Sequence, residues 1–116
     1  MSRKEARSEV DPETASKILA AVPPPEAFLF FTDIGGYTGE LAACLSDFCE
    51  KLKIIPAESI RFHHERGDFG KWIKGTLGDE YLAERISRIE STQAEELRKK
   101  IERIVQRRLN QLNRLA

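Results

Sequence analysis

The pairs Gly67-Asp68 and Gly78-Asp79, eleven residues apart, constrain the fold of this chain more than any other feature. Glycine readily adopts the left-handed conformation that ends a helix, and an aspartate side chain can cap the helix that follows. Each pair therefore predicts a minimal turn between two helices, with Asp68 and Asp79 as the caps. Three helices joined by such short turns must fold back on one another as a compact unit.

Apolar residues recur at helical spacing on both sides of these turns. They predict helices over residues 12–22, 39–54, 56–66, 69–77 and 80–90, and a longer one over 91–115. Asp11 with Pro12 predicts the start of the first helix, and Thr38 is expected to cap the second. The predicted fold is all-α, a single compact bundle of five to six helices with a long C-terminal helix. Residues 1–10 are expected to form a flexible tail and residues 11–116 one helical domain.

The window from Ala27 to Phe31 is the most apolar part of the chain, and it is too short to be a helix by periodicity. A lone strand without a partner leaves its backbone groups unpaired, so the sequence favours an extended or one-turn segment. Two interpretations of its aromatic residues remain open. Phe30 and Phe31 either fill the core or form a patch that binds a partner.

Composition excludes strong global electrostatic attraction. The chain has 19 basic and 19 acidic residues, so no overall field draws it to nucleic acid or to an anionic membrane. No stretch approaches the roughly 20 apolar residues that span a bilayer, and a cytoplasmic location is expected.

Cys44 and Cys49 fall on one predicted helix about 140° apart, so they cannot pair with each other and are expected to be reduced thiols.

One cluster of residues could carry chemistry, namely His63, His64 and Asp68. These side chain types suit a small acid–base or metal-assisted enzyme. However, adjacent helical residues point about 100° apart, so the two histidines cannot both face one metal from an unbroken helix. No serine or cysteine is paired with the cluster as a nucleophile. The alternative is structural, with one histidine packed beside Trp72 and the other solvated, and no cofactor is expected.

The basic end of the last helix offers another possible site. Arg107 and Arg108 could contact nucleic acid, but the candidate recognition helix from Asp79 to Ile89 carries three acidic residues against two basic ones, unlike a typical recognition helix. A solvated helix end is the favoured interpretation, because late positive charge suits the helix dipole. The length of this helix also predicts that it overhangs the bundle, which favours a homodimer.

The segment from Ser59 to His63 leads into Gly67-Asp68-Phe69, then Trp72-Ile73, Leu77-Gly78-Asp79 and Leu82-Ala83. This pattern resembles an uncharacterised family of small helical domains from archaea and some bacteria, over about residues 27–113. The resemblance implies one copy of that domain with a short N-terminal helix added, and it implies no activity.

The sequence therefore favours a non-enzymatic protein-interaction or regulatory module that binds a protein partner or a second copy of itself. Its candidate interaction residues are Phe30, Phe31, Arg107 and Arg108. The alternatives are an acid–base or metal-assisted enzyme that uses His63, His64 and Asp68, and a nucleic-acid-binding protein that uses the C-terminal arginines.

Overall fold

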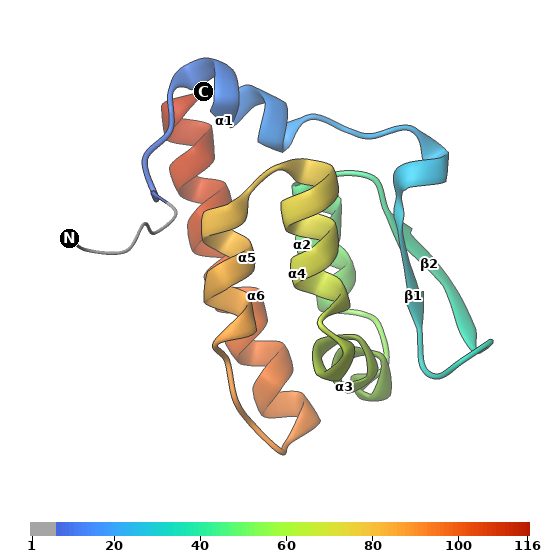
Figure 1. Ribbon diagram of the computed structural model, residues 1–116. Coiled ribbons are helices and arrows are strands. Elements are labelled where there is room, and N and C mark those ends of the chain that lie inside the picture. The colour runs from blue at the N-terminus through green and yellow to red at the C-terminus, as the bar shows by residue number, and fades with distance from the viewer. Residues whose placement is uncertain (1–6) are drawn as a thin grey trace.

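The computed structural model describes residues 7–116 (Figure 1). Helix α1 (Pro12–Leu19) begins where the sequence predicts, because Asp11 accepts a hydrogen bond from the Thr14 N–H (2.7 Å). The helix ends three residues before the predicted position, ahead of the prolines that cannot continue it. A 3-10 turn (Pro24–Glu26) then leads toward the hairpin. Of the expected flexible tail over residues 1–10, residues 1–6 lie outside the described part of the chain.

The apolar window and the segment after it form an antiparallel β-hairpin. Strand β1 (Phe28–Phe31) pairs with β2 (Tyr37–Ala42). The expected helix over 39–54 is therefore wrong in its first part, since residues 39–42 belong to a strand. Pairing with β2 satisfies the backbone groups on one edge of β1, which a lone strand would leave open.

An irregularity in the hairpin explains why the sequence pattern concealed β2. The pairing register shifts between Leu29 and Phe31, opposite a stretch of β2 in which Gly39 has a positive φ. Inside this stretch the Thr38 hydroxyl donates a hydrogen bond to the Phe30 carbonyl (2.8 Å). The prediction that Thr38 caps a helix is thus wrong. Such bulges interrupt the two-residue alternation by which a strand is recognised.

Helix α2 (Leu45–Leu52) begins after Cys44, whose sulfur accepts a hydrogen bond from the Asp47 N–H (3.5 Å). Cys49 lies inside the helix and is buried, and both thiols are free, as predicted. The apolar spacing from residue 45 onward is correctly helical. Only its extension back to Leu41 misled the prediction.

The Gly-Asp turns are present where the sequence predicts them. Gly67 (φ 75°) separates α3 (Ala57–Arg66) from α4 (Asp68–Trp72), which continues as a π-helical turn (Ile73–Leu77). Gly78 (φ 83°) precedes α5 (Glu80–Ser87), which Asp79 caps by accepting from the Leu82 N–H (3.2 Å). Asp68 makes no cap bond, so that part of the prediction is wrong. Its carboxylate binds side chains instead.

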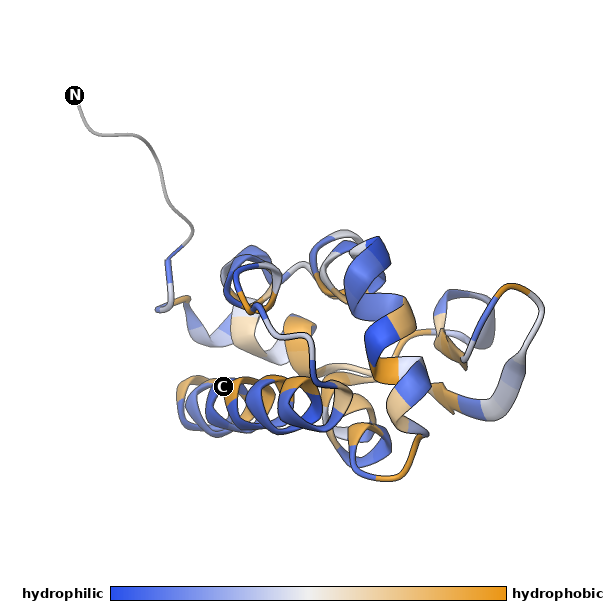
Figure 2. Ribbon diagram, turned by 90° about the horizontal axis from the view of Figure 1, so that it is seen from below, coloured by the Kyte–Doolittle hydropathy of each residue, from blue (hydrophilic) through white to orange (hydrophobic). Residues whose placement is uncertain are grey.

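Helix α6 (Ala94–Leu115) runs along one side of the helical part and packs against α1, α2, α3 and α5 (Figure 1). Its apolar stripe is buried within the chain, so the expected overhang is wrong. Figure 2 shows hydrophilic residues along the outer side of α6 and hydrophobic ones toward the other helices. The buried apolar residues are Leu97, Ile101, Val105, Leu109 and Leu112.

Within residues 7–116, six α-helices and the hairpin share one core. The predicted mainly helical fold with a long C-terminal helix is confirmed, and the hairpin adds to it. Phe28 and Phe30 point from β1 into this core, where both pack against Phe48 of α2 and Phe69 of α4. No helix within residues 7–116 combines the length and hydrophobicity that crossing a membrane requires.

Candidate functional site

A groove lies between the hairpin and the joint of α3 with α4. Its volume is about 490 Å³, within the roughly 300–1,000 Å³ that is typical of ligand sites. The hairpin wall consists of Phe28, Leu29, Phe31, Asp33, Ile34 and Gly35. The helix wall consists of Phe62, His63, Arg66, Asp68, Lys71 and Trp72. We call this site the hairpin groove.

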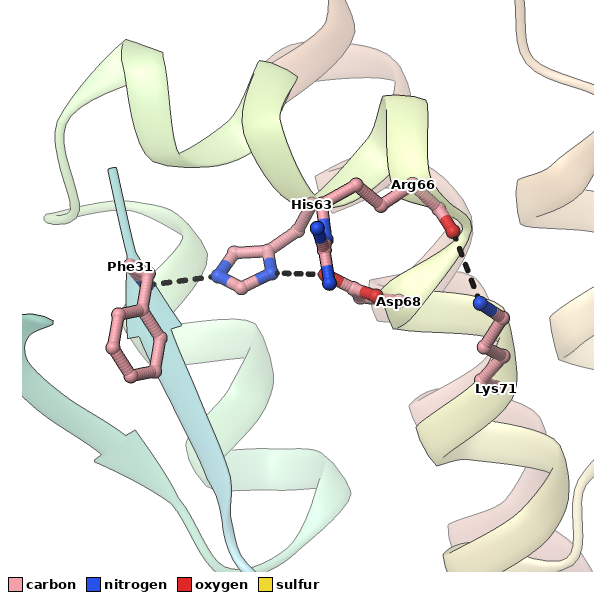
Figure 3. A network of polar contacts seen from close by, with 5 residues as sticks. All are labelled: Phe31, His63, Arg66, Asp68 and Lys71. Carbon is pink, nitrogen blue, oxygen red and sulfur yellow. Dashed lines mark hydrogen bonds and ion pairs between the residues drawn. The ribbon is translucent and has the colours of Figure 1, made fainter. Parts of the chain in front are cut away.

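His63 connects the two walls of the groove (Figure 3). Its Nε2 accepts a hydrogen bond from the Phe31 N–H (2.8 Å), and its Nδ1 lies 2.8 Å from Oδ2 of Asp68. Because Nε2 accepts from a backbone donor, the ring proton resides on Nδ1 and is donated to the carboxylate. Burial lowers the pKa of His63 below its ordinary value of 6.5, although Asp68 opposes this shift. The neutral ring is therefore the species that holds the walls together.

Asp68 accepts hydrogen bonds from two side chains, and the left-handed turn at Gly67 makes this possible. Besides His63, Nε of Arg66 donates to the same carboxylate oxygen (3.0 Å). The Arg66 guanidinium also lies 5.0 Å from the centre of the Phe62 ring. Lys71 donates to the Arg66 carbonyl oxygen (3.3 Å) (Figure 3). The helix wall thus carries two cations, Arg66 and Lys71, and one carboxylate, Asp68. Arg66 already balances the charge of this carboxylate.

The structure places His64 away from the groove. Its Nε2 donates to the Ile89 carbonyl oxygen (2.8 Å), beyond the end of α5. The predicted cluster is therefore only partly assembled, because His63 and Asp68 meet while His64 points elsewhere. Both ring nitrogens of His63 are engaged, so neither can accept a substrate proton unless a hydrogen bond breaks. Within residues 7–116, no three His, Cys, Asp or Glu side chains are grouped to hold a metal ion.

Aromatic rings surround His63 on several sides. Its neighbours are Phe28, Phe30, Phe31, Phe62 and Phe69, with ring centroids 4.8 to 6.4 Å away. The expected packing beside Trp72 is replaced by this phenylalanine cage. Trp72 instead donates its indole N–H to the Glu26 carbonyl oxygen (2.8 Å), just before β1. His63 and Trp72 of the helical part thus hydrogen-bond to the hairpin segment, one near each end of β1.

The hairpin exposes apolar side chains next to the groove. Five large hydrophobic residues are exposed within residues 7–116, and four of them belong to the hairpin: Leu29, Ile34, Tyr37 and Leu41. The fifth, Ile54, lies outside the groove. Of the two predicted interaction residues on β1, Phe30 is buried in the core and Phe31 is half-buried in the groove wall.

The two C-terminal arginines differ sharply in environment. Arg107 is exposed, whereas Arg108 is buried and bonds the Asp79 carboxylate through Nε and Nη2 (2.8 and 2.9 Å). Arg108 also stacks over Tyr81 (4.8 Å) and donates to the Ser8 carbonyl oxygen. The expectation of a solvated arginine is wrong for Arg108, because Asp79 compensates its charge inside the protein.

Several groove residues carry no marked pattern in the sequence. Leu29 and Ile34 were not singled out, and neither were Arg66 and Lys71. One signal could have marked Leu29: in a strand, alternate residues point to opposite faces, so buried Phe28 and Phe30 imply an outward Leu29. No local pattern marks Lys71, because its place in the groove depends on a hairpin distant in sequence.

A family model matches residues 25–116. The chain belongs to the family of unknown function DUF5752. The DUF5752 match begins after α1 and contains the hairpin, α2 to α6 and all residues of the groove. No curated protein and no solved structure matches the chain.

Proposed function

We propose that this protein is a non-enzymatic interaction module that binds an apolar segment of a partner protein in the hairpin groove. The observation that carries this proposal is the exposure of Leu29 (42%) and Ile34 (80%) in the wall of an apolar groove. Exposed apolar side chains gathered at a concave site are typical of binding surfaces. Burying them against a partner would remove apolar area from water.

The alternative of an acid–base enzyme has less support. His63 is the only histidine of the groove walls, and both its nitrogens are engaged. The described residues that line the groove include no serine, threonine or cysteine that could act as a nucleophile. Nucleic-acid binding at the C-terminal helix end is also less supported, because Arg108 donates its hydrogen bonds to Asp79 inside the protein.

Selection of peptides on the immobilised protein tests the proposal. The probe is a displayed library of random linear peptides, and we expect enrichment of sequences rich in apolar residues. Ile34→Asp should weaken binding of the enriched peptides by about tenfold or more, because it places a charge in the apolar wall. Ile34 is exposed, so the thermal unfolding of this variant should match that of the unmodified protein.

A matched control separates the groove from general stickiness. Ile54→Asp makes the same change at an exposed isoleucine outside the groove (63% exposed) and should leave binding intact. The proposal is wrong if no peptide is enriched, or if the two variants bind the enriched peptides equally well.

A further inference from the structure

Strand β1 presents one backbone edge to the groove. On the other side, Phe30 accepts from the Thr38 hydroxyl and Thr32 donates to the Gly36 carbonyl oxygen (2.9 Å), so both face β2. Successive strand residues direct their backbone groups to opposite sides. The backbone N–H and C=O groups of Leu29 and Phe31 therefore face the helices, as the bond from the Phe31 N–H to His63 demonstrates.

Leu29 is the open position on this edge. His63 occupies the Phe31 N–H, and Trp72 occupies the Glu26 carbonyl oxygen before the strand. Between them, the N–H and C=O of Leu29 bond to no group within residues 7–116 outside the hairpin, and alternation directs them away from β2. Leu29 lines the groove, and its two backbone groups lie on the edge of β1 that faces the helices, the same edge as the Phe31 N–H.

We propose that the partner segment binds in extended conformation and pairs one of its residues with Leu29 through both backbone groups. This inference rests on the proposed function and names the form of the partner. Strand addition gives affinity through main-chain hydrogen bonds and specificity through alternate side chains. It also extends the two-stranded hairpin to a three-stranded sheet. Side chains beside the paired residue contact the apolar walls.

The charges of the groove select an acidic residue on the same peptide. Asp68 already accepts from His63 and Arg66, so its charge is balanced. Lys71 bonds only a backbone carbonyl among residues 7–116, which leaves its positive charge without a carboxylate. On the opposite wall, Asp33 repels a second acidic group. The partner is therefore an extended apolar peptide with an acidic side chain directed at the helix wall.

Backbone methylation of the selected peptide tests the pairing. The best peptide from the selection is synthesised in forms that carry a single N-methyl group at each position in turn. We expect one form to lose about tenfold or more in affinity, while methylation at the adjacent, outward-facing amides is tolerated. Hydrogen exchange of the Leu29 amide, followed by NMR, should slow on binding of the unmodified peptide.

A charge exchange tests the second element. Lys71→Glu should weaken binding of the acidic peptide. Replacing the acidic residue of the peptide by lysine should restore binding to this variant. Equal affinity of all methylated forms, or unchanged exchange at Leu29, overturns the strand pairing even if Ile34→Asp still weakens binding. If Ile34→Asp binds the peptides as well as the unmodified protein does, the groove is not the binding site and the proposed function is wrong. The two failures are therefore distinguishable. A bound peptide with helical spacing of its essential residues also overturns the inference.

Discussion

His63 does with its side chain what a neighbouring strand would do with its backbone. Nε2 takes the place of a carbonyl acceptor for the Phe31 N–H, while Nδ1 is tied to Asp68. This arrangement closes part of an otherwise open strand edge, a feature that proteins protect because it invites pairing with other chains. It also attaches the hairpin to the turn at Gly67, so one residue sets the position of one groove wall relative to the other.

The same contacts predict a pH dependence of stability. The folded state favours neutral His63, whose pKa is lowered from 6.5 mainly by burial. Below that pH the unfolded chain binds a proton that the folded protein resists, so the free energy of unfolding falls with decreasing pH. The slope from this group is at most about 1.4 kcal/mol per pH unit. Urea denaturation between neutral and mildly acidic pH measures it.

Two variants assign this pH dependence to one histidine. His63→Gln should remove the contribution of His63, whereas His64→Gln should retain it. The prediction fails if both variants keep the same slope as the unmodified protein. Carboxylates act in a separate, lower window, since hydrogen bonds lower the pKa of Asp11 and Glu95 from 3.8 and 4.5.

Residue-level predictions from sequence succeeded where the cause is local. The separation of His63 from His64 follows from helical geometry alone, and Gly67 and Gly78 both adopt the predicted left-handed conformation. Asp68 was assigned to capping because that role needs only its neighbours. Its actual partners depend on how the Gly67 turn directs α4 back beside α3, which no spacing rule specifies.

At the level of elements, Asp79 serves two helices at once. One carboxylate oxygen caps α5, and both oxygens bind Arg108 of α6. The two side chains are 1% and 3% exposed as residues, so water compensates neither charge. The pair fixes the position of α5 on α6. Its loss on one side would leave a buried, unpaired charge, which costs more than the pair itself contributes.

Arg108→Met should therefore lower the free energy of unfolding by about 3–5 kcal/mol. The matched control is Arg107→Met, which changes the adjacent but exposed arginine and should stay within about 0.5 kcal/mol of the unmodified protein. Denaturant unfolding of both variants, with Asp79→Asn and the double variant, completes a cycle. Equal stability of the Arg107 and Arg108 variants would show that the buried pair is not coupled to folding.

The elements also show where sequence patterns lose information. The three helices around the Gly-Asp turns were predicted because glycine, aspartate and the apolar period act within one or two turns of chain. Strand β2 was missed because Gly39 interrupts its alternation, and because Leu41 and Leu45 happen to be four apart. Arg108 was placed in solvent because its partner lies 29 residues away.

At the scale of the whole molecule, α6 is the element on which α1, α2, α3 and α5 pack. A homodimer through α6 stays a prediction, but its apolar stripe is already covered by the chain's own helices. The exposed face carries Lys99, Arg103 and Arg107. A contact through that face would be polar and sensitive to salt, unlike the apolar interfaces of obligate dimers. Sedimentation at low and high ionic strength measures it.

Helix α1 lies before the region shared with the family, yet its packing makes it part of the core. Ala15 and Ile18 are completely or almost completely buried, and α1 packs on α6. Ile18→Ala should therefore lower the free energy of unfolding by about 2–4 kcal/mol, through lost burial and the cavity it leaves. Lys17→Ala changes the exposed neighbour and should have little effect. If α1 were only an appendage, both variants would unfold at the same denaturant concentration. A lower midpoint for Ile18→Ala alone, with an unchanged slope, would show that α1 and the family region unfold as one unit.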